Sequence, residues 1–205
     1  MTLKDILNLA PVVPVLTIEA VEHAVPLARA LAAGGLTALE ITLRTSAALE
    51  AMERIAGEVE GVVVGAGTVL NAADLERVAR AGAGFAVSPG LMDGAAPDGP
   101  VPLLPGAATA SEVMRAIAAG FTCLKFFPAV PAGGLAMLKS FGPVFPQVAF
   151  CPTGGVGLDN AASFLALPNV ICVGGSWVAP AQAVRDGDWS RITELARGAR
   201  QLLVP

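Results

Sequence analysis

Histidine is almost missing from this chain of 205 residues, and residues typical of metal and redox sites are scarce. His23 is the only histidine, and no second histidine or acid cluster stands at metal-ligand spacing. The three cysteines, Cys123, Cys151 and Cys172, occur singly in short apolar runs. That placement favours packing as small hydrophobes over a disulfide or a metal site. We therefore expect no metal and no cofactor, and a surface or capping role for His23.

Charged residues are also sparse, at 15% of the chain, and they are not clustered in one segment of the sequence. The 13 lysines and arginines are scattered, and the net charge of -4 argues against a nucleic-acid surface. No charge occurs between Asp159 and Arg185, but proline, glycine and polar residues interrupt this stretch too often for a membrane span. The first residues show an early acid, Asp5, and no apolar core of a secretory signal. We expect a cytoplasmic protein with a small-molecule partner.

Apolar residues are abundant instead, at 54% of the chain, with a mean hydropathy of +0.66. The length suits one domain, residues 1–205, and no linker or low-complexity tract divides it. This apolar content exceeds what one core readily hides, so we expect a homo-oligomer that covers the surplus.

Short β-branched runs alternate with Ala-rich helical segments, which is the rhythm of repeated β-α units. The expected strands are Val12–Leu16, Leu39–Thr42, Val62–Ala66, Phe85–Ser88, Pro102–Leu104, Cys123–Phe126, Ala149–Pro152 and Ile171–Gly174. The expected helices are Ala20–Ala33, Ala47–Glu58, Ala72–Ala81, Ser111–Ala119, Leu135–Phe141, Asn160–Leu165 and Ser190–Leu203.

Brief connections and fully apolar strands predict a single-domain α/β fold, a closed parallel (β/α)8 TIM barrel. A doubly wound open sheet is the alternative, but no G-x-G-x-x-G follows the first strand. Thr2–Asn8 predicts a short helix that closes the bottom of the barrel. The segment 91–99, after the fourth strand, leaves room for only about a turn or two of helix.

Lys125 is the one charged residue in the sixth expected strand, where it is flanked by Leu124 and Phe126. A primary amine among apolar groups is costly to keep charged, which favours the neutral, nucleophilic form that makes a Schiff base with a carbonyl. Period two places Phe127 beside the amine. The alternative is a buried ammonium that is paired with a carboxylate for structural reasons.

The second expected strand ends in an acid, a hydroxyl and a guanidinium at every second position: Glu40, Thr42 and Arg44. Alternation sends all three to one face if the extended conformation persists to Arg44. At the mouth of a barrel they would supply a general base and a carboxylate clamp. A solvated edge with an internal salt bridge is the other interpretation.

Glycines follow several strands, where they bring backbone close to a ligand or make tight turns. The third strand leads through Gly65 and Gly67 to Thr68, which offers a hydroxyl to a ligand or caps the next helix. Glycine pairs after the seventh and eighth strands, Gly154-Gly155 and Gly174-Gly175 followed by Ser176, expose amide N–H groups where such barrels commonly hold phosphate. Turns without a ligand are the alternative.

Motifs along nearly the whole chain, in order, resemble those of the 2-keto-3-deoxy-6-phosphogluconate (KDPG) aldolase family, class I aldolases of the Entner–Doudoroff route. The resemblance is carried by 11–15 (PVVPV), 40–45 (EITLRT), 64–71 (VGAGTVLN), 88–90 (SPG), 125–129 (KFFPA), 150–155 (FCPTGG) and 174–177 (GGSW).

The resemblance implies a metal-independent lyase, usually a homotrimer, that cleaves a phosphorylated keto acid to pyruvate and glyceraldehyde 3-phosphate. Some activity on 2-keto-4-hydroxyglutarate is also expected. It implies Lys125 as the Schiff-base lysine and Glu40 as the acid-base residue. Substrate contacts are assigned to Arg44, Thr68, Pro89, Phe127 and Thr153, and phosphate contacts to Gly154, Gly155, Gly174, Gly175 and Ser176.

Related aldolases of the galactonate epimer usually have an apolar residue at the position that matches Thr153, so the threonine favours the gluconate epimer. The chain departs from many relatives at Ala107–Thr109, where they carry a hydroxyl residue before the threonine. An aldolase for the galactonate epimer stays open as an alternative. Two further rivals are a phosphosugar isomerase or metal-dependent aldolase on the same barrel, and a non-catalytic phosphosugar-binding barrel.

Overall fold

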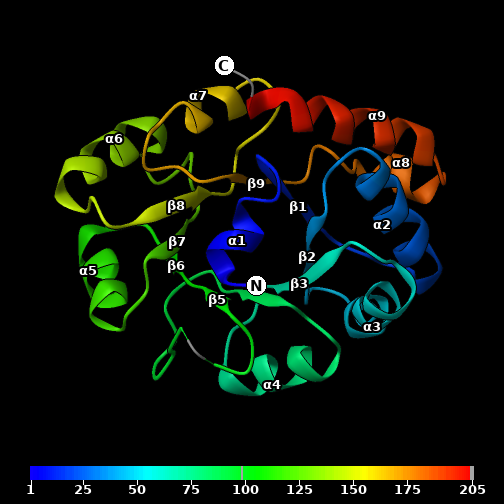
Figure 1. The fold of residues 1–205 in the computed structure, drawn as a ribbon, viewed down its shortest axis with the longest axis horizontal. Coiled ribbons are helices and arrows are strands. Elements are labelled where there is room, and N and C mark those ends of the chain that lie inside the picture. The colour runs from blue at the N-terminus through cyan, green and yellow to red at the C-terminus, as the bar shows by residue number, and fades with distance from the viewer. Residues whose placement is uncertain (98, 204–205) are drawn as a thin grey trace.

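Short parallel strands form the centre of the molecule, and helices surround them (Figure 1). The computed structural model describes residues 1–97 and 99–203. The strands are β1 (Val12–Leu16), β2 (Ala38–Thr42), β3 (Val63–Gly67), β4 (Phe85–Val87), β5 (Leu103–Leu104), β6 (Gly106–Ala107), β7 (Cys123–Phe126), β8 (Ala149–Pro152) and β9 (Val173–Gly175). The α-helices are α1 (Leu3–Leu7), α2 (Ala24–Ala33), α3 (Ala48–Glu58), α4 (Ala72–Arg80), α5 (Ala110–Ala118), α6 (Gly134–Val144), α7 (Ala161–Leu165), α8 (Ala181–Arg185) and α9 (Trp189–Arg200). Two 3-10 turns, η1 (Val21–His23) and η2 (Gln201–Leu203), adjoin α2 and α9.

The strands pair in parallel throughout and form two sheets. The larger sheet has the order β5-β4-β3-β2-β1-β9, and the smaller has the order β6-β7-β8. Only Pro105 separates β5 from β6, and its carbonyl accepts a 2.9 Å hydrogen bond from the backbone N–H of Lys125. On the other side, an isolated parallel bridge pairs Thr153, directly after β8, with Gly174 of β9. The chain is therefore an α/β protein built on two parallel sheets.

Side chains of the strands alternate between two apolar cores, which explains why apolar residues fill whole strands. Leu39, Ile41 and Phe126 belong to the larger core between strands and helices. The opposite faces of the strands and α1 build a second, smaller core inside the sheet layer. It contains Ile6, Leu7, Val13, Ala38, Phe85, Val87, Leu104, Cys123, Cys151 and Cys172.

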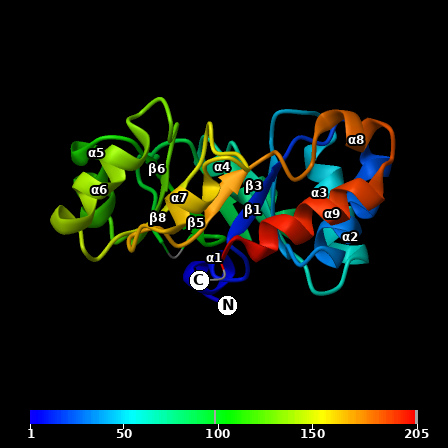
Figure 2. The same ribbon diagram turned by 90° about the horizontal axis from the view of Figure 1, so that it is seen from above.

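Helix α1 closes the N-terminal ends of the strands, as the sequence predicted. Figure 2 shows α1 on one side of the sheets, near the N-terminus of the chain. A capping box between Thr2 and Asp5 fixes its start, and Ile6 and Leu7 are buried at 2% and 1% exposure. The carboxyl ends of the strands therefore face the opposite side, where the predicted site residues gather.

The fold differs from the sequence prediction at three elements. The fifth strand is split at Pro105, because proline cannot donate to the strand ladder. Helix α6 extends to Val144 and includes Pro143, and α8 was not predicted. Residues 91–97 and 99 form turns without a helix, whereas Asp98 lies outside the described residues. None of the described helices has the length and apolar character needed to cross a membrane.

Candidate active site

Lys125 of β7 and Glu40 of β2 meet inside the sheet layer, as a buried pair from opposite parts of the sequence. The Nζ atom lies 3.3 Å from Glu40 Oε1, and the two side chains are only 7% and 4% exposed. Neighbouring Leu124 and Ile41 point to the outer core, so both polar side chains face inward. Such a pair is retained at a desolvation cost that apolar residues would avoid, which is typical of a functional site.

An aromatic ring covers the amine, as period two predicted for Phe127. The Nζ atom of Lys125 lies 5.1 Å from the ring centroid, in a cation–π arrangement. The ring face stabilises the ammonium, while its bulk keeps water away from it. The amine is therefore enclosed between a carboxylate oxygen and an aromatic ring.

The carboxylate of Glu40 rests against the α-carbon of Gly67. A Cβ at residue 67 would overlap Oε1, and Gly67 is the last residue of β3, next to β2 in the sheet. The sequence predicted that the β3 glycines let the backbone approach a ligand. At Gly67, the group that approaches the backbone is the Glu40 side chain. Glycine is required at residue 67 because the acid occupies the space of a side chain.

We expect the substitution Gly67→Ala to displace the Glu40 carboxylate from Lys125. The added methyl group should lower the free energy of unfolding by about 1–3 kcal/mol and turnover by about 10-fold or more. Thermal unfolding and steady-state kinetics measure the two effects. Gly57→Ala, in α3, is the matched control: no atom lies within 4 Å of the added Cβ, and alanine should stabilise the helix by about 0.5–1 kcal/mol. Turnover within about twofold of the parent in Gly67→Ala would contradict this interpretation of the glycine.

Arg44 and Thr68 form a second polar pair at the carboxyl edge. Arg44 Nε donates a 3.3 Å hydrogen bond to Thr68 Oγ1. Thr68 has a φ of 60°, a left-handed conformation that is costly for a β-branched residue and is often found at functional sites. Thr68 does not cap α4, because Asn71 accepts that hydrogen bond, so the capping alternative is wrong.

The extended conformation of the second strand does not persist to Arg44, because β2 ends at Thr42 and a turn follows it. Thr42 is buried, and its hydroxyl donates to the carbonyl of Leu16 at 3.0 Å, so it closes a structural contact. Arg44 is exposed beyond the turn and reaches Thr68 from there. The clamp prediction for Arg44 therefore depends on the loop, and not on strand alternation.

The loops after β8 and β9 lie together, as predicted for a phosphate site. The Thr153–Gly174 bridge joins them, and the α-carbon of Gly174 rests against the Thr153 hydroxyl. Gly154 and Gly155 have φ values of 98° and 77°, which only glycine adopts readily. Within the described residues the amides of Gly154 and Gly155 donate to no other group, so they are available to an anion.

Phe127 connects the amine with these loops. A Cβ at Gly154 would lie 3.3 Å from its ring, whose centroid also lies 5.1 Å from Nζ of Lys125. Ser176 is exposed beside the loops, and Thr153 is 7% exposed. Pro89 is exposed, and its carbonyl lies against Gly106, the residue that pairs with Lys125 in the sheet. Every predicted site residue thus lies at or inside the carboxyl edge of the strands.

The three cysteines lie together in the inner core, and all three are free thiols. A hydrogen-bonding contact with Cys151 and burial raise the pKa of Cys172 well above its usual value, and burial raises the pKa of Cys123. Both remain neutral thiols at ordinary pH, which confirms their prediction as small packing residues. In the described part of the chain, no group of three or more acid, histidine or cysteine side chains is placed to hold a metal. His23 is half-buried and packs edge-on against Trp189 on the outer helices, and its side chain makes no capping hydrogen bond to α2, so the capping alternative is wrong.

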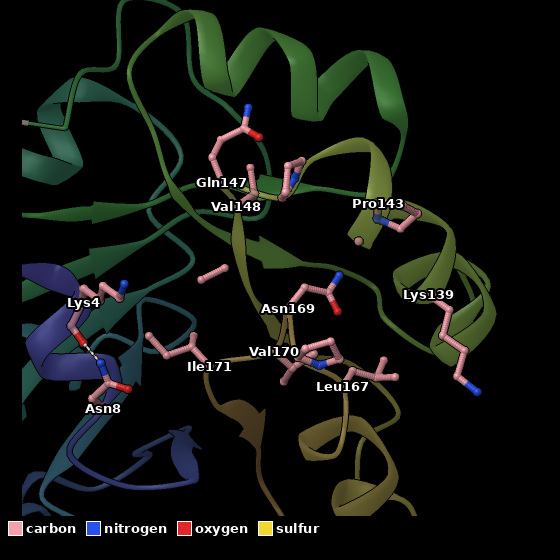
Figure 3. Close-up of a pocket in the computed structure, with 14 residues that line it drawn as sticks. Lys4, Asn8, Lys139, Pro143, Gln147, Val148, Leu167, Asn169, Val170 and Ile171 are labelled. Atoms are coloured by element: carbon pink, nitrogen blue, oxygen red, sulfur yellow. Dashed lines mark hydrogen bonds between the residues drawn. The ribbon is translucent and has the colours of Figure 1, made fainter.

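A cavity of about 840 Å³ lies away from this site, near α1 and the ends of α6 and α7 (Figure 3). Its lining includes Lys4, Asn8, Lys139 and Asn169, and none of the predicted site residues. Figure 3 shows the amine of Lys139 directed away from the other labelled side chains. This cavity and the buried Lys125–Glu40 pair are therefore separate features of the molecule.

Comparison with known proteins identifies the family of this chain. Residues 3–195 match the family described as KDPG and KHG aldolase, where KHG stands for 2-keto-4-hydroxyglutarate. The chain is 54% identical over 200 residues to a 2-dehydro-3-deoxy-phosphogluconate aldolase of Pseudoalteromonas atlantica, covering 96% of this chain and 93% of the relative.

Two solved structures are similar along almost the entire length. A KDPG aldolase of Legionella pneumophila, with pyruvate captured at low pH as a covalent carbinolamine intermediate, has a TM-score of 0.94 and 45% identity, covering 97% of this chain and 98% of the other. A KDPG aldolase of Zymomonas mobilis with 3-phosphoglycerate has a TM-score of 0.89 and 48% identity, with 97% and 94% covered.

Proposed function

This chain belongs to the KDPG and KHG aldolase family, and from that premise we propose that it is a class I aldolase that cleaves KDPG to pyruvate and glyceraldehyde 3-phosphate. The observation that carries the proposal is the buried pair of Lys125 and Glu40 under the ring of Phe127. A pyruvate carbinolamine in a relative with 45% identity supports the covalent route. Some activity on KHG is part of the same proposal.

The scaffold we propose is a closed (β/α)8 barrel made of the single domain 1–205. Treating β5 and β6 as one strand interrupted by Pro105 gives eight parallel strand positions. The Thr153–Gly174 bridge supports closure between the seventh and eighth of these positions, and the Pro105 carbonyl supports it between the fifth and sixth. Chemistry in such barrels occurs at the carboxyl ends of strands, which is where the predicted site residues lie.

Lys125 is the nucleophile in this mechanism. Glu40, 3.3 Å away, is placed to take the proton from the ammonium. The free amine attacks the C2 ketone to form a carbinolamine. The protonated Glu40 then returns its proton to the carbinolamine hydroxyl, which leaves as water, so an iminium ion forms and Glu40 is again a carboxylate. The iminium withdraws electrons from the C3–C4 bond of the substrate and so prepares it for cleavage.

Glu40 serves as the base and then as the acid. It takes the proton of the C4 hydroxyl, directly or through a water, as the C3–C4 bond breaks and its electron pair passes to the iminium nitrogen. Glyceraldehyde 3-phosphate leaves and an enamine remains on Lys125. Protonation of that enamine at C3, followed by hydrolysis, releases pyruvate and restores the amine.

Anchors at both ends of the substrate align the bond to be broken. Arg44, with Thr68, binds the carboxylate, and Pro89 and Phe127 line the space between the carboxylate and the amine. The amides near Gly154, Gly155, Gly174 and Gly175, with the Ser176 hydroxyl, bind the phosphate. Thr153 lies near the cleaved bond and favours the gluconate epimer over the galactonate epimer.

Borohydride reduction in the presence of pyruvate tests the proposal directly. We expect a pyruvyl adduct that peptide mapping places on Lys125, with activity that survives EDTA. Unmodified protein would favour a non-catalytic phosphosugar-binding barrel, in which the buried pair is only structural. Activity that EDTA abolishes would favour a metal-dependent rival on the same scaffold.

A homotrimer in the cytoplasm completes the proposal. Large apolar side chains are exposed at Leu70, Met114, Val130, Val144 and Leu158, and a partner subunit would cover such groups. Light scattering should give three times the 20.6 kDa of one chain. A monomeric mass would contradict the trimer, and cell fractionation tests the compartment.

A further inference from the structure

We propose that Trp177 is a positioning residue: its indole ring holds the backbone of Gly175 and Ser176 in place for the phosphate of the substrate. Through that backbone it makes the enzyme prefer phosphorylated over non-phosphorylated keto acids. This inference rests on the proposed aldolase function and on its phosphate site. Trp177 follows that site by one residue and was not among the predicted contacts.

The indole ring of Trp177 lies directly on the α-carbon of Gly175. A Cβ on Gly175 would overlap the six-membered ring, with Cζ3 and Cε3 as its nearest neighbours. The side chain therefore folds back by two residues and takes the space that a side chain at 175 would occupy. Gly175 and Trp177 form a matched pair, and the loop that ends in Ser176 is held between them.

The ring lies on the outer face of β9. Along β9, Val173 belongs to the outer core, Gly174 turns inward against Thr153, and Gly175 turns outward again. Trp177 also packs against the outer core and lines a cavity of about 330 Å³ with Leu27, Ser176 and Val184. The indole therefore acts through the backbone, and a direct contact with the phosphate is not required.

The polar atom of Trp177 does not account for this placement. Its Nε1 is buried and has no hydrogen-bond partner among the described residues. A buried donor without a partner costs roughly 1–3 kcal/mol, so the residue does not serve its own stability through that atom. Its role therefore lies in the contact between the flat ring and Gly175, which holds the backbone of the phosphate loop.

A small shift of this loop affects only substrates that use it. Displacing anchoring groups by about 1 Å can cost about 100-fold in rate. KHG lacks the terminal phosphate of KDPG, so its turnover depends on Lys125, Glu40 and Arg44 but much less on Ser176. The ratio of the two activities therefore reports the position of the loop.

Kinetics of matched tryptophan and phenylalanine variants test this inference. For Trp177→Ala we expect KM for KDPG to rise by about 10-fold or more, while kcat/KM for KHG falls by less than about threefold. Trp177→Phe keeps a ring on Gly175 and removes the unpartnered donor, so we expect both activities within about threefold of the parent. Trp189→Ala, on the outer helices, is the control and should change neither KM for KDPG nor kcat/KM for KHG.

Equal losses on both substrates in Trp177→Ala, or no loss on KDPG, would overturn the inference. Thermal unfolding shows whether Trp177→Ala folds. If it does not, the same kinetic comparison is made with Trp177→Leu. A double-mutant cycle adds a second measurement, because Gly175→Ala should raise KM for KDPG more in the parent than beside Trp177→Ala. Equal effects in both backgrounds would also overturn it. Failure of the parent to trap pyruvate or cleave KDPG would instead defeat the proposed function.

Discussion

Replacing Lys125 by alanine should abolish turnover, with a loss of at least about 10,000-fold in kcat, because the nucleophile of the proposed covalent route is removed. Borohydride and pyruvate should then leave the protein unmodified. The variant should still fold: breaking a buried ion pair costs about 3–5 kcal/mol, which is less than the stability of most domains of this size. Steady-state kinetics, mass spectrometry and thermal unfolding measure these three results.

Lys139→Ala is the matched control, because Lys139 is exposed on α6 and outside the predicted site. It should trap pyruvate and turn over KDPG like the parent. The double variant Lys125→Met with Glu40→Gln removes both buried charges, so it should recover about 1–4 kcal/mol relative to either single variant and remain inactive. Turnover that persists in Lys125→Ala would defeat the assignment of the nucleophile.

Glu40→Gln should lower kcat for KDPG cleavage by about 100- to 10,000-fold, because the amide keeps the shape of the acid but cannot accept the C4 hydroxyl proton. Lys125 remains in this variant, so a slower pyruvate adduct should still form. That difference separates the proton-transfer step from the covalent step. Rapid-quench kinetics and trapping with pyruvate measure the two.

Glu53→Gln controls for the change of charge, since Glu53 is exposed on α3. We expect kcat within about twofold of the parent. A Glu40→Gln variant with parental turnover would show that another group moves the proton. Loss of both turnover and the adduct, with the fold intact, would instead show that Glu40 is needed to activate the amine.

Strand positions were predicted well where apolar runs are bounded by turn residues. Cys123–Phe126 and Ala149–Pro152 match β7 and β8 to the residue, because each run is short and ends at a loop. The inward position of Lys125 followed from the same runs, since one polar residue among apolar ones has to face the interior or a partner. Strand alternation also predicted Phe127 beside the amine.

Contacts between distant segments were not predicted, because they depend on the tertiary structure. Gly67 gave a general glycine signal, but only the structure shows that the Glu40 carboxylate lies against it. The ring of Trp177 on Gly175 was missed for the same reason. The sequence signal for this contact was a glycine, Gly175, two positions before Trp177. Arg44 reaches its partner from a turn, which period-two reasoning about β2 does not describe.

The helix α1 has a kinetic consequence on the proposed mechanism. Ile6, Leu7 and the thiols fill the N-terminal end of the strands, so a substrate that enters from the carboxyl edge must also leave there. The aldehyde fragment carries the phosphate and lies nearer the loops, and pyruvate remains on Lys125 beneath it. Product release is then ordered, with the phosphorylated fragment first, and added pyruvate should compete with the incoming substrate for the emptied enzyme.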